Sequence, residues 1–188
     1  MDISEFESIV EGSEESQNLD FKASCNWDIK TLAKDILAFS NVQDGGLIVI
    51  GFEDKTFIRT GVDDKIAETY KLETMQDQMA NYADPFVNFS VYNNIVDSKG
   101  QRFVVIKITE FSEIPTVCRK DSGDVQKGVI YYRGRTRRPE SAPVSNSYDM
   151  RDILDRAAVK LMVKRQSQGF KVEASDQSAF YKEELGGL

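Results

Sequence analysis

Residues 38–54, AFSNVQDGGLIVIGFED, decide the architecture of the chain. Upstream of this stretch, apolar side chains recur from Ile29 at the i, i+3, i+4, i+7 spacing of an amphipathic helix over residues 28–42. Asp44 and the two glycines after it end the helix, because glycine adopts the left-handed backbone that a helix C-terminus often needs. The run LIVIGF follows without a polar side chain, as in a central strand covered on both faces. We therefore expect a helix packed on a buried sheet.

The flanking segments carry patterns of the same two kinds. We expect a helix over residues 2–12, a strand at 19–23, a second helix from 63 to the proline at 85, two hairpin strands at 86–96 and 101–108, a strand at 125–132 and a last helix from Ser147. The apolar residues of the last helix predict one packed face, made of Met150, Ile153, Leu154, Ala157, Ala158, Leu161 and Met162. Together the elements predict one α+β domain over residues 1–165, with a mixed central β-sheet flanked by helices. Residues 166–188 are expected to form a partly helical tail.

The composition narrows the classes of function. With no histidine the chain has no Ser-His-Asp or Cys-His catalytic group, and two cysteines are too few for a structural zinc site. The formal net charge of −7 argues against a protein that coats nucleic acid without specificity. No apolar run is long enough to span a bilayer and no signal peptide is visible, so we expect a cytoplasmic protein with free thiols.

The stretch ESQNLDFKAS, residues 15–24, places carboxylates at Glu15 and Asp20 beside the first expected strand. Asp54 follows the LIVIGF strand, and strand ends meet at one edge of a sheet, so these three carboxylates are candidate ligands of one metal ion. Mg²⁺ or Mn²⁺ prefers such oxygen ligands and activates water beside a phosphate. Lys22 shares the strand face of Asp20 and is a candidate contact for the scissile phosphate. The residues alone leave a second interpretation open, in which all three carboxylates are solvated.

Positive charge gathers in one segment of this acidic chain. Residues 115–138 hold seven arginines and lysines against two aspartates. Arginine binds phosphate through two parallel hydrogen bonds, and a tyrosine ring stacks on an unpaired base. The candidate nucleic-acid-binding residues are Arg119, Lys120, Lys127, Tyr132, Arg133, Arg135, Arg137 and Arg138. A strand with solvated charges followed by a basic loop is the alternative interpretation.

The glycine pair at 45 and 46 does not match a nucleotide-binding loop. It lacks the GxxxxGK[ST] pattern, and it lies between a helix and a strand, whereas such a loop runs from a strand into a helix. We therefore expect no nucleotide cofactor.

Four of these stretches, in this order, resemble the Schlafen-type AlbA domain family: ESQNLDFK, AFSN with its two glycines, IGFED, and YYRGR with small residues after it. The resemblance covers residues 13–160 and implies an α+β fold of the Schlafen core-lobe type. It also implies a nucleic-acid partner, with RNA such as tRNA favoured over DNA. In animal Schlafen proteins a three-carboxylate site makes some members metal-dependent endoribonucleases, and its positions fall here on Glu15, Asp20 and Asp54.

Two departures from the family pattern bear on this expectation. Asp20 is one methylene shorter than the glutamate of the active animal enzymes, and the animal proteins pair two such lobes in one chain. A homodimer is expected to supply the second lobe here. The resemblance favours a prokaryotic endoribonuclease that cleaves tRNA-like RNA with Mg²⁺ or Mn²⁺, with a role in antiviral defence by analogy. The alternative is a non-catalytic DNA- or RNA-binding module, such as a transcriptional regulator or a defence-system subunit.

Overall fold

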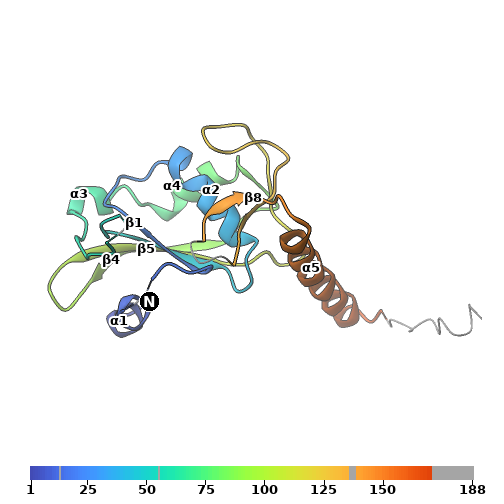
Figure 1. The fold of residues 1–188 in the computed structure, drawn as a ribbon, viewed down its shortest axis with the longest axis horizontal. Helices are drawn as coiled ribbons and strands as arrows, with labels where there is room; N and C mark the ends of the chain where they lie inside the picture. Colours follow the sequence, from blue (N-terminus) through green and yellow to red (C-terminus); the bar gives the residue numbers. More distant parts are fainter. Residues whose placement is uncertain (13, 55, 136–138, 171–188) are drawn as a thin grey trace, which may run out of the picture.

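A four-stranded sheet lies at the centre of the protein (Figure 1). The computed structural model describes residues 1–170 except 13, 55 and 136–138. Within the sheet the order is β1 (Leu19–Lys22), β2 (Gly46–Ile50), β5 (Arg102–Ile108) and β4 (Phe89–Val96). The pair β1–β2 is parallel, and the other two pairs are antiparallel. The expected α+β class with a mixed sheet is therefore confirmed.

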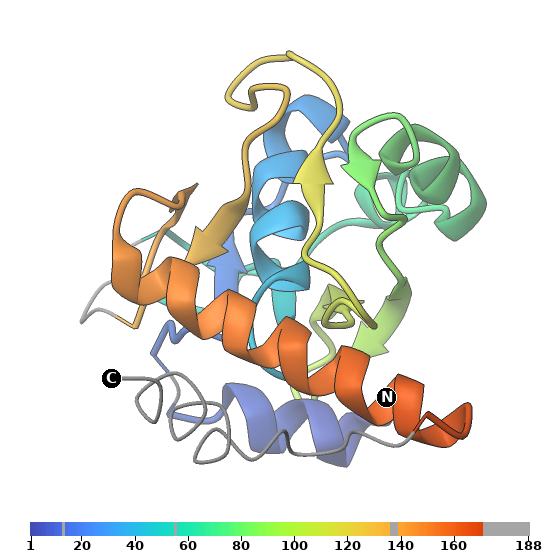
Figure 2. The same cartoon turned by 90° about the vertical axis from the view of Figure 1, so that its right-hand side faces the viewer.

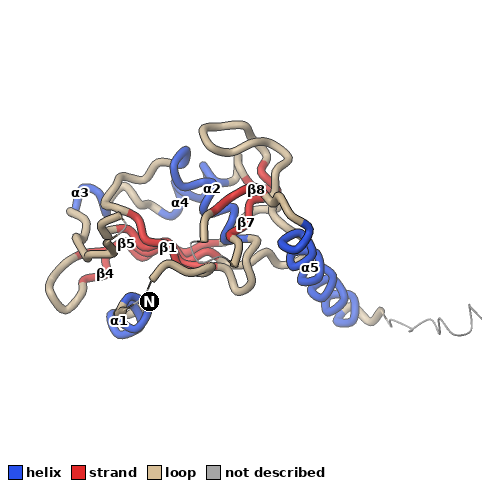
Figure 3. Tube along the Cα trace, in the orientation of Figure 1, coloured by secondary structure: helices blue, strands red, loops and turns tan. Residues whose placement is uncertain are grey.

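Helices cover both faces of the sheet (Figure 3). On one face, α2 (Ile29–Ser40) joins β1 to β2 and packs together with α4 (Leu72–Met79). On the opposite face lies α1 (Ile3–Val10). Between the two layers, β2 buries Ile48 on the α2 side and Val49 on the α1 side. This confirms the prediction that the LIVIGF strand is covered on both faces.

The local sequence explains where α2 begins and how the chain turns into β2. Asp28 precedes the helix, and its side chain accepts a hydrogen bond from the backbone N–H of Lys30 at 3.0 Å. After the helix, Gly45 has a φ of 72°, and a Cβ there would lie 2.1 Å from the carbonyl oxygen of Ile108. Glycine alone fits this turn, which brings the chain from α2 directly against β5.

Two short ribbons flank the sheet. One pairs β3 (Ala83–Asp84) with β6 (Val117–Cys118), and the other pairs β7 (Tyr131–Arg133) with β8 (Ser141–Pro143). Both strands of the second ribbon lie along α2. The last helix, α5 (Ser147–Ser167), runs across this side of the molecule (Figure 2).

Two expected elements are shorter than the sequence suggested. The helix predicted from residue 63 onward is divided into α3 (Asp64–Ala67) and α4, because the chain between them turns Tyr70 into the core. The strand predicted at 125–132 begins only at Tyr131, since Gly128 with a φ of 82° turns the preceding loop.

The packed face predicted for α5 is wrong in most of its members. Only Ile153 and Ala157 are buried there, whereas Leu154 and Met162 remain 54% and 47% exposed. The body of the protein therefore covers only one narrow stripe of α5 around Ile153 and Ala157. Beside this stripe, Lys160 forms an ion pair with Glu110 at 3.3 Å.

Two smaller expectations can be compared with the described residues. Both cysteines, Cys25 and Cys118, are free thiols, as predicted. Among the helices of residues 1–170 that the structure describes, none has the length and apolar character needed to cross a membrane.

Candidate functional site

The alternation of β1 divides its side chains between the two faces of the sheet. Leu19 and Phe21 face α1, and the Phe21 ring lies 4.3 Å from the Phe52 ring. Asp20 and Lys22 face α2, where the sheet otherwise carries apolar residues. A carboxylate and an ammonium thus enter the interface between sheet and helix.

Three further side chains join this pair in an ionic cluster, which we define as Glu15, Asp20, Lys22, Asp35 and Arg133. Lys22 Nζ lies 2.9 Å from Asp20 Oδ2 and also 2.9 Å from Asp35 Oδ2. Arg133 Nη2 lies 2.9 Å from Asp20 Oδ1 and 4.0 Å from Glu15 Oε2. The cluster joins the segment before β1, β1 itself, α2 and β7. It contains three carboxylates and two cations.

Arg133 is an interior residue of this cluster. Its side chain is 2% exposed, and its guanidinium lies 5.3 Å from the centre of the Phe39 ring. Its Nε donates to the carbonyl oxygen of Ser16 at 3.0 Å. The expectation that Arg133 contacts phosphate at the surface does not match this placement. The guanidinium lies inside the fold, where it neutralises the carboxylate of Asp20.

Tyr132 is likewise placed inside the protein. It is 3% exposed, its hydroxyl donates to Asp152 Oδ2 at 2.9 Å, and it accepts from Gln17 Nε2 at 2.9 Å. Burial, together with the bond to Asp152, raises the pKa of Tyr132 to about 12. The ring is therefore not at the surface in a position to stack on a base.

The charges of the cluster act on one another. Burial and the neighbouring Asp20 carboxylate raise the pKa of Glu15, partly offset by the Phe21 N–H and by Arg133. Burial lowers the pKa of Lys22, but the Asp35 and Asp20 carboxylates outweigh it, so the pKa lies above its usual value. Lys22 is therefore a permanent cation rather than a proton acceptor.

Asp54 lies apart from this cluster. It is an exposed residue of the turn after β2, which is closed by a hydrogen bond from Glu53 N to the Ile58 carbonyl. In the part of the chain that the structure describes, no group of three His, Cys, Asp or Glu side chains is placed to hold a metal ion. As placed, Glu15, Asp20 and Asp54 do not form the expected three-carboxylate set, and Asp20 already has two cationic partners. Metal binding by these three residues stays a prediction.

The remaining candidate basic residues lie in two places. Arg119, Lys120 and Lys127 are exposed on the loop between β6 and β7, at the N-terminal end of α2 (Figure 2). Arg135 lies near the opposite end of α2, where its Nε donates to Gln17 Oε1 at 3.0 Å. Arg137 and Arg138 lie outside the described residues.

Sequence analysis missed two polar residues of this region. Asp35 is 5% exposed on α2, and the available signal was a carboxylate one turn after Leu32 on the apolar side of the helix. Asn41 is fully buried at the end of α2, where its Nδ2 donates to the carbonyls of Thr116 and Tyr131, each at 2.9 Å. Asn41 Oδ1 accepts from Thr116 N at 2.8 Å, so this residue ties α2 to the flanking ribbons.

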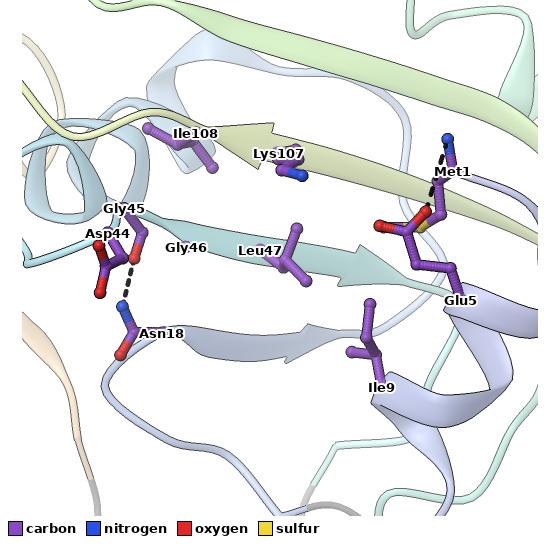
Figure 4. A pocket seen from close by; sticks show the side chains of 10 residues that line it. All are labelled: Met1, Glu5, Ile9, Asn18, Asp44, Gly45, Gly46, Leu47, Lys107 and Ile108. Atoms are coloured by element: carbon purple, nitrogen blue, oxygen red, sulfur yellow. Dashed lines mark hydrogen bonds and ion pairs between the residues drawn. The ribbon is translucent and has the colours of Figure 1, made fainter.

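Two shallow pockets lie elsewhere on the surface. The pocket in Figure 4 has a volume of about 290 Å³ and lies beside α1 and β2, where Ile9, Leu47 and Lys107 line it. A second, of about 600 Å³, lies beside the β4–β5 hairpin and contains Arg59. Neither pocket is lined by a residue of the ionic cluster.

A model of the Schlafen, AlbA_2 family matches residues 15–140, a span that contains the whole ionic cluster. The chain belongs to the Schlafen AlbA_2 family. A comparison with curated proteins gives no match. The Schlafen AlbA_2 assignment agrees with the resemblance inferred from the motifs.

Two solved structures are similar to this Schlafen AlbA_2 chain. The crystal structure of the DIP2311 protein from Corynebacterium diphtheriae has a TM-score of 0.50 at 17% identity, over 80% of this chain and 31% of that one. The chain thus spans less than a third of that protein, and the likeness shows the fold alone. The solution structure of the N-terminal domain of a RecG-related protein from Nitrosomonas europaea has a TM-score of 0.44 at 14% identity, over 73% of this chain and 92% of that domain.

Proposed function

We propose that this Schlafen AlbA_2 chain binds nucleic acid, and that the contact is made by a basic surface comprising Lys30, Arg119, Lys120 and Lys127. All four side chains are exposed. Within the described residues none of the four has an acidic side chain within ion-pair distance, whereas Arg59, Arg102, Arg133 and Arg156 all do. Unpaired, exposed cations are the groups that exchange their counterions for phosphates. This clustering of unpaired charge is the observation that carries the proposal.

The loop that carries three of these residues is held in place. Tyr82 Oη donates to Ser122 Oγ at 3.0 Å, and Lys127 N donates to Asp121 Oδ1 at 2.8 Å. A Cβ at Gly123 would lie 3.5 Å from the carbonyl oxygen of Lys30, so the loop lies directly against the start of α2. A fixed loop lowers the entropic cost of ordering the cations on a ligand.

Nearby acids reduce the field of this surface without cancelling it. Asp124 lies 4.0 Å from Lys34, and Asp121 is engaged by the backbone of its own loop. The surface therefore keeps an excess of positive charge on a chain whose formal net charge is −7. Such a local patch favours a defined contact over general coating of nucleic acid.

The test compares binding of a tRNA and of duplex DNA by fluorescence anisotropy. Substitution of Arg119, Lys120 and Lys127 by Gln is expected to weaken binding by about tenfold or more, since each neutralised phosphate contact is lost. The preferred ligand decides between RNA and DNA.

A charge-matched control is available on other surfaces of the protein. Lys65, Lys71 and Lys99 are exposed and lie on α3, before α4 and in the β4–β5 hairpin. Their triple Gln variant carries the same net charge as the test variant. Equal losses of affinity in the two variants would contradict a localised basic surface.

Cleavage of structured RNA is the second candidate function. It is favoured by the proximity of the Glu15 and Asp20 carboxylates beside the cationic Lys22, where burial and then the charge of Asp20 raise the pKa of Glu15. If the chain is a metal-dependent endoribonuclease, tRNA incubated with Mn²⁺ is cleaved by wild type and spared by Asp20→Ala or in the presence of EDTA. Identical results for wild type and Asp20→Ala would leave binding without cleavage.

A further inference from the structure

An exposed aromatic side chain lies on the ribbon that leads into the basic surface. Phe86, two residues beyond β3, is 47% exposed. Among the residues that the structure describes, the other exposed aromatic side chains are Tyr148 on α5 and Phe170 after it. One exposed apolar residue is common on a protein surface, so the neighbours of Phe86 decide whether it has a function.

The pairing of β3 with β6 relates Phe86 to the basic surface. The carbonyl of Tyr82, just before β3, accepts a hydrogen bond from Arg119 N at 2.8 Å, which extends the ribbon by one pair. Phe86 is four residues after Tyr82, so their Cα atoms lie at most about 14 Å apart. Figure 2 shows the two strands of this ribbon in green and yellow, alongside α2 and below the loop between β6 and β7. One extended ligand can therefore reach both Phe86 and Arg119.

The aromatic ring and the nearest arginine also share one face of the ribbon. The paired residues Ala83 and Cys118 are buried in the core beside α2. Because side chains alternate along a strand, the next pair faces outward, and its member Asp84 is exposed. Phe86 lies two residues after Asp84, and Arg119 lies two residues after the partner of Asp84. Both are exposed, as this alternation requires.

A second cation is fixed at the same end of the ribbon as Arg119. Lys120 Nζ lies 5.3 Å from the centre of the Tyr82 ring, and this ring is 4% exposed. The ribbon thus has cations at one end and an exposed ring at the other, with the carboxylate of Asp84 between them. Asp84 repels phosphate, so it weakens rather than supports binding of an anion here.

We propose that the outer face of the β3–β6 ribbon binds an unpaired stretch of nucleic acid, with a base stacked on Phe86 and neighbouring phosphates on Arg119 and Lys120. The inference rests on the proposed function, because it names the ligand class of the same basic surface. Aromatic rings beside cations bind single strands with little sequence preference. In a duplex the faces of each base are covered by its neighbours, and exposing them costs unstacking energy. The ribbon is therefore selective for single strands.

The experiment measures binding of the full chain to a short oligouridine, to an oligothymidine of equal length and to a duplex DNA by fluorescence anisotropy. Phe86→Ala is expected to weaken binding of both single strands by about fivefold or more, and binding of the duplex by less than about twofold. Phe86→Trp retains an aromatic ring and is expected to bind the single strands at least as tightly as wild type.

Tyr148→Ala is the matched control. It removes an aromatic side chain that is 70% exposed on α5, and it is expected to bind all three ligands as wild type does. The proposal is overturned if Phe86→Ala binds the single strands as wild type does, if it loses as much affinity for the duplex, or if Tyr148→Ala shows the same loss.

Asp84→Asn gives a second test that leaves the ring in place. Removal of the repelling carboxylate is expected to strengthen binding of the single strands. Glu11→Gln removes the same charge beside α1, on the opposite face of the sheet, and is expected to have no effect. If Phe86→Ala does not fold, equal affinities of Asp84→Asn and Glu11→Gln overturn the proposal.

The Gln variant of Arg119, Lys120 and Lys127 separates this inference from the proposed function. If that variant binds every ligand as wild type does, the basic surface itself is wrong. If it loses affinity while Phe86→Ala does not, the basic surface stands and only the stacking on Phe86 is overturned.

Discussion

Asp20 and Arg133 meet at 2.9 Å across the interface between β1 and β7, with both side chains almost fully buried. This ion pair connects the first strand of the sheet to a ribbon that lies far away in the sequence. It also explains why the arginine-rich segment is not a uniform surface. Arg133 neutralises Asp20 in the core, whereas the other described cations of the segment lie outside.

The Asp20–Arg133 pair predicts that substitutions at two neighbouring arginines have very different effects on the stability of the protein. Arg133→Met leaves Asp20 buried with Lys22 alone, and we expect a loss of about 3–5 kcal/mol in the free energy of unfolding. Arg135→Met is the control, since that side chain is 51% exposed and its loss should cost about 0–1 kcal/mol. Urea denaturation measures both values. Equal effects would show that the Asp20–Arg133 pair does not stabilise the fold.

Glu15 predicts a specific pH dependence. Its pKa in the folded protein is raised above the usual 4.5. In the pH range between the usual and the raised pKa, the folded state therefore binds more protons than the unfolded state. The stability of wild type should therefore fall, relative to Glu15→Gln, as the pH rises through this window. The Gln side chain keeps an acceptor for the Phe21 N–H, which bonds Glu15 Oε1 at 3.2 Å. Denaturation curves measured from acidic to neutral pH check this, and a constant difference between the two proteins would contradict it.

The buried hydrogen bonds of Asn41 predict that removal of its side chain strongly lowers the stability of the fold, although no charge is lost. Asn41→Ala removes the acceptor of Thr116 N and the donor to two buried carbonyls, so we expect a loss of about 3 kcal/mol. Asn41→Asp should be at least as destabilising, because a carboxylate would face the carbonyl oxygens of Thr116 and Tyr131. Thermal unfolding of the three proteins checks this order. A tolerated Asn41→Asp would show that the bonds at the end of α2 are dispensable.

Alanine substitutions at two glycines with similar backbone angles are expected to lower the stability of the protein by unequal amounts. Gly45→Ala would place a Cβ 2.1 Å from the Ile108 carbonyl oxygen at a φ of 72°. Gly128→Ala has the same type of strain, with a φ of 82°, but meets nothing within 4 Å. We expect Gly128→Ala to cost about 1–2 kcal/mol, and Gly45→Ala to cost clearly more because β5 must also shift. Similar melting temperatures for the two variants would contradict the close approach.

The regular elements of the fold were predictable because their periodicity is local. The apolar spacing around Leu32 and Ile36 placed α2, and the LIVIGF run placed β2. The face of α5 was not predictable, since the apolar residues of this helix exceed what the body covers and only Ile153 and Ala157 are buried. Sequence patterns show that a helix has apolar residues, but not how many of them find a partner.

The candidate site was predictable only in part. The alternation of β1 correctly put Asp20 and Lys22 on one face, because the side-chain period of a strand is two. The burial of Arg133 and the contribution of Asp35 depend on how α2 and β7 pack, which no local pattern contains. The basic segment therefore divided into an interior arginine and an exposed loop in a way that charge counting did not reveal.

The salt dependence of binding tests the proposed basic surface most directly. The logarithm of the association constant for tRNA is to be measured against the logarithm of salt concentration for wild type, for the Gln variant of Arg119, Lys120 and Lys127, and for the Gln variant of Lys65, Lys71 and Lys99. The account predicts that the first variant has a slope less negative than wild type by about 2–3, and that the second variant keeps the wild-type slope. A wild-type slope in the first variant, or equal changes in both, would contradict it.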